Sequence, residues 1–117
     1  MEIREIIFED ATPVDGYGPG FFRIAGEVIE GPVIVTASSV RSWGGEGDTA
    51  ALTALAGEVD VVLFGCGADM LALPTALIAE VEAAGMGLEP MSSPSACRSY
   101  NILLSEGRRV ALAALPV

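Results

Sequence analysis

SPSACRSYNILLSEGRRVALAAL, residues 93–115, is the stretch that decides the fold. Its Ser-Pro start predicts a helix over residues 94–105, with Ser93 as the N-cap and Pro94 at the first helical position. Gly107 is of the residue type that commonly ends a helix. The apolar residues after it predict a closing strand. The stretch therefore reads as one helix followed by one core strand.

The residue spacing separates two faces of this predicted helix. Cys97 and Tyr100 share one face, whereas Arg98 and Ile102 share another. We expect the first face to pack against the protein core, which would make Cys97 a buried thiol. A helix start beside an arginine can also lower the pKa of a cysteine. A reactive Cys97 is therefore the alternative interpretation.

The second half of the chain predicts a β-α-β-α-β arrangement. An apolar run at residues 59–64 indicates a central strand that is covered on both faces. Helices are predicted over residues 49–56 and 74–84, and a further strand over 86–91. Together with residues 93–115, these connections favour parallel strands.

The first half of the chain predicts a β-meander of short strands. Glycine and proline punctuate the predicted strands, which cover residues 3–8, 22–25, 27–30 and 33–37. The segment GYGPG at residues 16–20 precedes a strand rather than opening a helix, so it predicts a turn and not a nucleotide-binding loop. The predicted fold class is α/β: a single three-layer domain over residues 1–117 with a central mixed, mainly parallel sheet, helices packed on it and an N-terminal β-meander.

The composition is both apolar and acidic. Hydrophobic residues make up 51% of the 117 residues and the mean hydropathy is +0.53, which indicates either a core rich in small aliphatic residues or an apolar surface that meets a partner. The formal net charge of −10 would repel a phosphate backbone and anionic lipids, so we expect no nucleic-acid partner. No apolar run reaches the roughly 20 residues of a membrane-spanning helix.

Two missing residue types narrow the possible chemistry. The chain has no histidine and no lysine, which excludes a Ser-His-Asp or Cys-His mechanism, a histidine-ligated metal and a lysine Schiff base. The two cysteines, Cys66 and Cys97, lack metal-ligand spacing and are expected to be reduced and buried. The N-terminus matches neither a signal nor a transit peptide. We therefore expect a cytoplasmic protein with no metal and no cofactor.

Several segments together resemble one family. They are YGPGFFRIAG at residues 17–26, the pair Ser42 and Trp43, VVLFGCG at residues 61–67, and much of residues 96–115. In this order they resemble a family of small, mostly uncharacterised bacterial and archaeal proteins that also includes the mitochondrial respiratory complex I assembly factor 3. The resemblance implies a three-layer α/β domain with a central mixed sheet, a protein partner, and no established catalytic residues.

A candidate ligand pocket follows the predicted central strand. Gly65, Cys66 and Gly67 begin a loop that runs to Asp69, and ligands of open α/β sheets favour the carboxyl ends of strands. Small residues there allow a ligand to approach the backbone, but they equally allow tight packing between a strand and a helix. The pocket would be completed from the predicted helix by Cys97, Arg98, Tyr100 and Asn101.

Other polar and aromatic residues have a structural and a functional interpretation. We expect Asn101 and Glu106 to hydrogen-bond the backbone or arginine side chains such as Arg98 around the last strand. We expect Tyr100 to be largely buried. Tyr17 and Trp43 lie on glycine-rich loops, so each is either a partner contact or part of the core.

Two functions of different classes follow from these observations. The first is a non-enzymatic protein-interaction or assembly module; through the family resemblance, it would assist respiratory-complex or membrane-protein biogenesis. The alternative is a small-ligand-binding protein or enzyme that uses the loop from Gly65 to Asp69 beside Cys97 and Arg98. The negative surface would steer a protein partner that is basic. The oligomeric state stays open.

Overall fold

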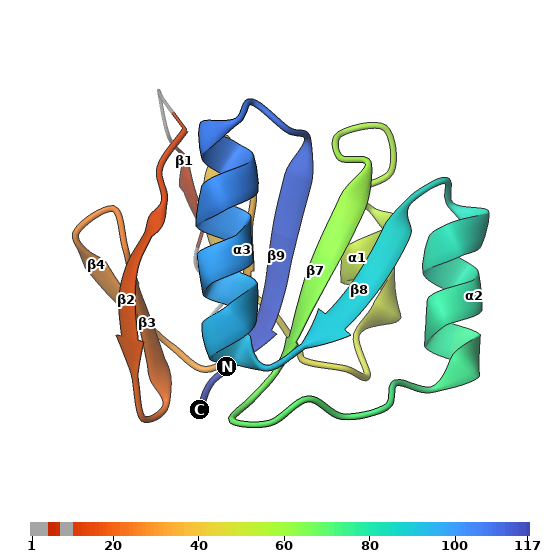
Figure 1. Ribbon diagram of the computed structural model, residues 1–117, viewed down its shortest axis with the longest axis horizontal. Helices are drawn as coiled ribbons and strands as arrows, with labels where there is room; N and C mark the ends of the chain where they lie inside the picture. Colours follow the sequence, from red (N-terminus) through yellow and green to blue (C-terminus); the bar gives the residue numbers. More distant parts are fainter. Residues whose placement is uncertain (1–4, 8–10) are drawn as a thin grey trace.

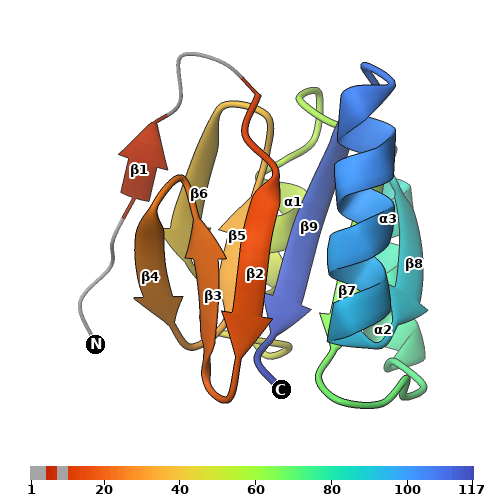
Figure 2. The same cartoon turned by 60° about the vertical axis from the view of Figure 1, so that its left-hand side comes forward.

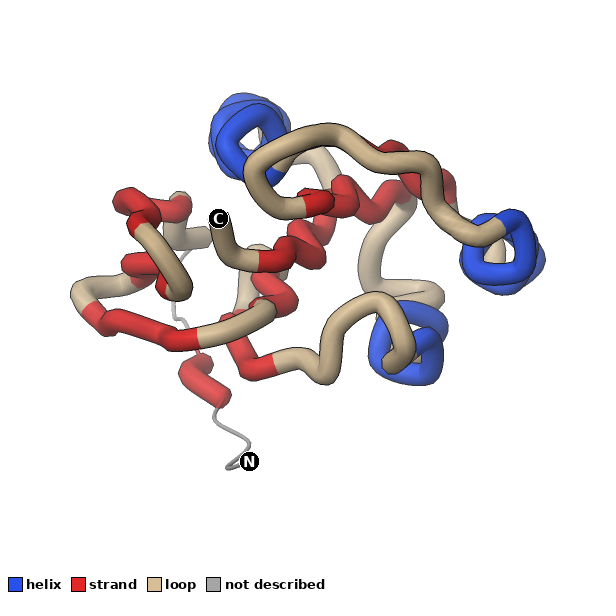
Figure 3. The backbone as a smooth tube through the Cα atoms, turned by 90° about the horizontal axis from the view of Figure 1, so that it is seen from below, coloured by secondary structure: helices blue, strands red, loops and turns tan. Residues whose placement is uncertain are grey.

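A mixed sheet divides the molecule into two cores (Figures 1 and 3). The computed structural model describes residues 5–7 and 11–117. Within them, the main sheet contains β1 (Glu5–Ile7), β5 (Val33–Val35), β6 (Ser39–Ser42), β7 (Val61–Cys66), β8 (Gly87–Met91) and β9 (Val110–Leu115). The strand order is β1-β6-β5-β9-β7-β8.

The helices and a second sheet cover the two faces of the main sheet. The helices are α1 (Thr49–Thr53), α2 (Thr75–Ala83) and α3 (Ser93–Ser105), and the small sheet contains β2 (Val14–Gly18), β3 (Phe21–Ile24) and β4 (Glu27–Glu30) in this order. Helix α3 and the small sheet share one core, whereas α1 and α2 pack on the other face (Figure 3). The three-layer α/β fold predicted from the sequence is confirmed.

The main sheet is parallel in one half and antiparallel in the other. Strands β8, β7 and β9 pair in parallel, as the β-α-β-α-β pattern predicts. Strand β5 then joins β9 in the antiparallel sense, and β6 and β1 continue antiparallel. The expectation of a mainly parallel sheet is therefore correct only for the C-terminal half, because a hairpin from the meander extends the sheet.

Strand β7 is buried on both faces, as its apolar run predicts. Leu63 faces the core under α3, whereas Val62 and Phe64 face the core under α1 and α2. The strand pairs with a neighbour on each side. It covers Val61–Cys66, whereas the predicted range was 59–64. Asp60, which precedes the strand, is exposed.

Helix α3 matches the prediction except at its cap. The N-cap is Ser92, whose hydroxyl accepts a hydrogen bond from the amide of Ser95, and Pro94 lies in the first turn. The predicted N-cap, Ser93, is instead the first helical residue, and its buried hydroxyl contacts the main sheet. Gly107 follows the helix with a φ of 76°, in the left-handed region that favours glycine.

The other two helices agree with the sequence to different degrees. Helix α2 differs by one residue at each end from the predicted range 74–84. Helix α1 covers only Thr49–Thr53 of the predicted range 49–56, and turns follow it. Asp48 precedes α1 without capping it, because its carboxylate accepts a hydrogen bond from the amide of Gly44.

Two strands were absent from the sequence-based prediction. Strand β2 lies in the segment predicted as a loop, and the tight turn is confined to Pro19 and Gly20. Strand β6 covers residues that had no predicted element. Of the predicted first strand at residues 3–8, the structure confirms Glu5–Ile7, and the rest lies outside the described residues.

None of the helices in the described part of the chain is long and apolar enough to cross a bilayer.

Candidate functional site

A groove of about 330 Å³ separates β2 from α3. Strand β2 is the strand of the small sheet nearest to α3 (Figure 2). Strand β2 contributes Asp15, Gly16 and Tyr17 to the lining. Helix α3 contributes five residues that the sequence analysis discussed: Pro94, Cys97, Arg98, Asn101 and Ile102. We call this feature the β2–α3 groove.

Asn101 joins the two walls of the β2–α3 groove. Its side-chain oxygen accepts a hydrogen bond from the amide of Val14 at 2.8 Å, and its side-chain nitrogen donates one to the carbonyl oxygen of Val14 at 3.0 Å. The prediction that Asn101 hydrogen-bonds backbone is confirmed, but its partner is β2 and not the last strand. Each such hydrogen bond contributes roughly 1 kcal/mol to stability.

Cys97 lies at the inner side of the groove and is 4% exposed. Burial raises the pKa of its thiol to about 11. The thiol is therefore protonated near neutral pH, and the thiolate that would act as nucleophile or metal ligand is scarce. Cys97 is the core thiol of the first interpretation.

Tyr100 belongs to the core and not to the groove. It is fully buried, as predicted, and packs among the apolar residues between α3 and the sheets. Its hydroxyl has no hydrogen-bond partner among the described residues. Burial raises the pKa of Tyr100 above its ordinary value. Tyr100 therefore lines no cavity described here.

The groove is lined by exposed side chains that are both apolar and charged. Tyr17 on β2 is 44% exposed and Ile102 on α3 is 53% exposed. Arg98 is also exposed on this side of α3. The predicted network of Arg98, Asn101 and Glu106 is wrong: within the described residues, Arg98 and Glu106 have exposed side chains with no ion pair.

The glycines after β7 make room for α3 rather than for a cavity. A Cβ atom at Gly65 would lie 2.7 Å from the Ser93 hydroxyl oxygen and 3.0 Å from the Ser93 Cα atom. The Gly67 amide donates a hydrogen bond to the same hydroxyl at 2.9 Å, and the Ser93 amide donates one to the Gly67 carbonyl at 2.7 Å. The Ser93 hydroxyl in turn donates to the Leu115 carbonyl. Helix α3 thus occupies the space beside Gly65 and Gly67 that a ligand would need.

The predicted pocket residues therefore divide into two groups. Gly65, Cys66 and Gly67 line none of the cavities described here, whereas Cys97, Arg98 and Asn101 line the β2–α3 groove. Cys66 packs in the core under α1 and α2, on the opposite face of the main sheet from Cys97. Both cysteines are buried free thiols, as predicted.

Trp43 is part of the core, which corrects its candidacy as a partner contact. The side chain is 2% exposed and packs edge to face against Phe64, with 5.4 Å between the ring centroids. Its indole nitrogen donates a hydrogen bond to the carbonyl of Asp48 at 3.1 Å. Trp43 therefore anchors the loop that leads to α1. Tyr17, by contrast, is available on the surface.

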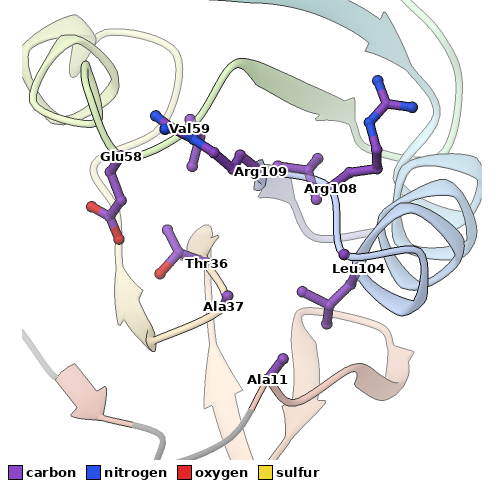
Figure 4. Close-up of a pocket in the computed structure, with 10 residues that line it drawn as sticks. Ala11, Thr36, Ala37, Glu58, Val59, Leu104, Arg108 and Arg109 are labelled. Atoms are coloured by element: carbon purple, nitrogen blue, oxygen red, sulfur yellow. The ribbon is translucent and has the colours of Figure 1, made fainter.

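A second cavity, of about 220 Å³, lies beside the α3–β9 connection (Figure 4). The side chains of Arg108 and Arg109 point away from each other there (Figure 4). Arg109 donates a hydrogen bond to the carbonyl of Gly57 at 2.7 Å and pairs with Asp60 at 3.6 Å. Glu58 accepts a hydrogen bond from Ser38. Most of the charged groups here therefore hold neighbouring turns together.

The sequence analysis missed one exposed apolar feature. Met70 and Leu71, in the loop between β7 and α2, are 64% and 60% exposed. The signal in the sequence was the apolar segment MLAL directly after the glycine-rich loop, outside any predicted helix or strand. Among the described residues, no group of three or more acidic or cysteine side chains could hold a metal ion.

Comparison with known proteins identifies relatives of the whole domain. The model of a family described as "Protein of unknown function (DUF498/DUF598)" matches residues 14–115. An uncharacterised protein of Rhodobacter capsulatus is 56% identical over all of this chain and 94% of its own length. The resemblance seen in the sequence is confirmed.

Two more distant relatives have descriptive names. NADH dehydrogenase [ubiquinone] 1 alpha subcomplex assembly factor 3 of Danio rerio is 29% identical over 90% of this chain, which spans 64% of that protein's length. The crystal structure of an outer membrane protein from Bartonella henselae superposes with a TM-score of 0.82 at 29% identity and covers 92% of this chain and 97% of that one.

Proposed function

The chain belongs to this family of proteins of unknown function, and from that premise we propose that it is a non-enzymatic protein-interaction module that binds a partner at the β2–α3 groove. The observation that carries the proposal is the exposure of Tyr17 and Ile102 on the two walls of one groove. Aromatic and aliphatic side chains beside a concave surface are the usual anchors of protein interfaces.

The ionisable groups around the groove support binding better than turnover. General acid–base catalysis near neutral pH is most efficient with a group whose pKa is close to the ambient pH. The chain has no histidine, and the raised pKa of Cys97 keeps its thiol protonated. Asn101, the best-placed polar side chain, is occupied by the backbone of Val14.

The biological setting of the proposal comes from the relatives. One of them is named an assembly factor of NADH dehydrogenase. By analogy, we place this chain in the assembly of a respiratory or other membrane-protein complex, acting from the cytoplasm. The net charge of −10 favours association with a protein that is basic overall.

Small-ligand binding is the second candidate, and the size of the groove favours it. A volume of about 330 Å³ lies within the range of ligand pockets. The exposed guanidinium of Arg98 could orient a polar ligand. The site is then the β2–α3 groove and not the loop from Gly65 to Asp69.

Affinity capture of a protein partner by variants with an added charge distinguishes the interaction module from the ligand-binding protein. Ile102→Glu introduces a carboxylate beside the groove, and Ala79→Glu introduces the same group on the exposed face of α2 as a control. We expect one stoichiometric protein partner with the unmodified chain and with Ala79→Glu, and its loss with Ile102→Glu at unchanged melting temperature. Equal recovery by both variants contradicts the proposal. Co-purification of a metabolite that is lost with Arg98→Ala favours the second candidate.

A further inference from the structure

Within the described residues, strand β2 is hydrogen-bonded in a sheet along one edge only. It pairs with β3 in the described sheet, and its other edge lies on the side of α3 (Figures 1 and 2). The β2–α3 groove lies between them. Unpaired strand edges present backbone amides and carbonyls that can pair with a further strand. The hydrogen-bond partners of the backbone groups on this edge therefore decide whether it can accept a further strand.

At one end of the edge, Asn101 takes the place of a neighbouring strand. Its amide oxygen accepts from the Val14 amide and its amide nitrogen donates to the Val14 carbonyl, at 2.8 and 3.0 Å. This is the pair of hydrogen bonds that a residue of an adjacent antiparallel strand would make. The backbone amide and carbonyl of Val14, on the outer edge of β2, are therefore already hydrogen-bonded as they would be to a neighbouring strand.

Beyond Val14, no strand of the described residues pairs with this edge. A register shift between Val14 and Gly16 separates the capped end from a regular segment, in which Gly16, Tyr17 and Gly18 follow one another against β3. No hydrogen bond from α3 reaches residues 15–17 in the described structure. A Cβ atom at Gly16 would meet nothing within 4 Å. The space beside Gly16 is therefore open, and Asp15 and Tyr17 complete this wall of the groove.

The opposite wall specifies which side chains would fit. Arg98 is the one charged residue of α3 and has no ion pair within the described residues. Ile102 offers an exposed apolar surface one turn further along the helix. An extended segment in the groove would therefore place an apolar side chain between Ile102 and Tyr17, and an acidic side chain beside Arg98.

We propose that the partner inserts an extended segment into the β2–α3 groove, where the segment pairs with Gly16–Gly18 as an added strand and places a carboxylate on Arg98. This inference deepens the proposed function and rests on it. Main-chain pairing supplies affinity in such complexes, and alternate side chains supply specificity.

Photo-crosslinking identifies the segment first. A photo-reactive amino acid at Ile102 is expected to give one discrete adduct in cells, and the same group at Ala79 on α2 is expected to give none. The crosslinked segment of the partner is then synthesised as a peptide, and its affinity for the purified chain is measured.

Backbone N-methylation of this peptide is the decisive measurement. In an added strand, alternate amides face β2, so methylation of one alternating set should weaken binding about 10-fold or more per amide, while the other set is tolerated. Arg98→Glu should also weaken binding, and a lysine in place of the facing acidic residue of the peptide should restore it. Such a restoration identifies the pairing independently of any effect on folding.

Different results would contradict strand addition and the proposed interaction module. If Ile102 crosslinks to a partner but neither alternating set of methyl groups changes the affinity, or if the charge exchange restores nothing, strand addition is wrong and the interaction module stands. If the groove position captures no protein, or if adducts arise only at Ala79, the proposed function is wrong as well.

Discussion

The side-chain amide of Asn101 on α3 forms two hydrogen bonds with the backbone of Val14 on β2, 87 positions away in the sequence. Among the described residues, this contact is the side-chain hydrogen-bonded link between the small sheet and the helix that covers the main sheet. It also closes one end of the β2–α3 groove. Two backbone groups are satisfied by one side chain, so its loss leaves a donor and an acceptor unpaired.

Asn101→Ala should therefore lower the stability of the protein. Removing the partner of half-buried backbone groups costs about 1–3 kcal/mol, which thermal or urea unfolding would detect. Ser105→Ala is the matched control, because Ser105 is exposed on the same helix and bonds only the local carbonyl of Ile102. An unchanged melting temperature for Asn101→Ala would contradict the assignment of Asn101 as a structural clamp.

A pair of glycine substitutions tests the packing of α3 on β7. Gly65→Ala forces a methyl group against the backbone and hydroxyl of Ser93, and overpacking of this kind costs about 1–3 kcal/mol. Gly16→Ala places the same group in open space and should change stability by less than about 0.5 kcal/mol. Chemical unfolding of both variants measures the difference. Equal stabilities would mean that Ser93 does not fill the space above Gly65.

Trp43→Ala should act on folding and not selectively on partner binding. The side chain is buried against Phe64, and truncation of a buried tryptophan costs about 3–5 kcal/mol. Unfolding should therefore occur at a markedly lower denaturant concentration. A variant with unchanged stability but lost partner capture would restore Trp43 as a partner contact.

The stability of the fold should decline at alkaline pH. Burial raises the pKa of Cys97 from 9.0 to about 11 and raises that of Tyr100 in the same direction. Well below pH 9 both groups are protonated whether the chain is folded or unfolded. As the pH rises through 9 the unfolded chain releases its thiol proton while the folded chain retains it, so the free energy of unfolding falls.

Urea unfolding between pH 7 and pH 11 measures this decline. Cys97→Ala and Tyr100→Phe each remove one of the two groups, so each variant should show a shallower decrease than the unmodified protein. Tyr100→Phe also removes a buried hydroxyl that lacks a partner among the described residues, and it should not destabilise the protein at pH 7. If the stability of both variants fell with pH as steeply as that of the unmodified protein, the effect would belong to other groups.

The sequence predicted those helices and strands that are determined by the spacing of nearby residues. The apolar run of β7 and the amphipathic spacing of α3 gave both elements, and the burial of Cys97 and Tyr100 followed from that spacing. Strand β2 was not predicted, because glycines alternate along it and a register shift interrupts its pairing. Glycine is depleted in strands, so it indicated a loop.

The candidate site could be predicted only in part. Cys97, Arg98 and Asn101 were named from the helix, but the wall opposite them comes from residues 14–17, which the chain brings close only in three dimensions. Trp43 had two interpretations for the same reason, since the burial of a loop residue depends on tertiary contacts. A glycine such as Gly65 after a strand suits both a ligand site and tight packing, and only the position of Ser93 in the fold distinguishes the two.

Hydrogen exchange of the chain, alone and bound to its captured partner, tests the central claim most directly. If the partner occupies the β2–α3 groove, the backbone amides of residues 14–18 and 98–105 should become protected on binding. Exposed residues 68–72, in the loop after β7, serve as the internal comparison. Protection confined to that loop, with unchanged exchange in β2 and α3, would contradict the account.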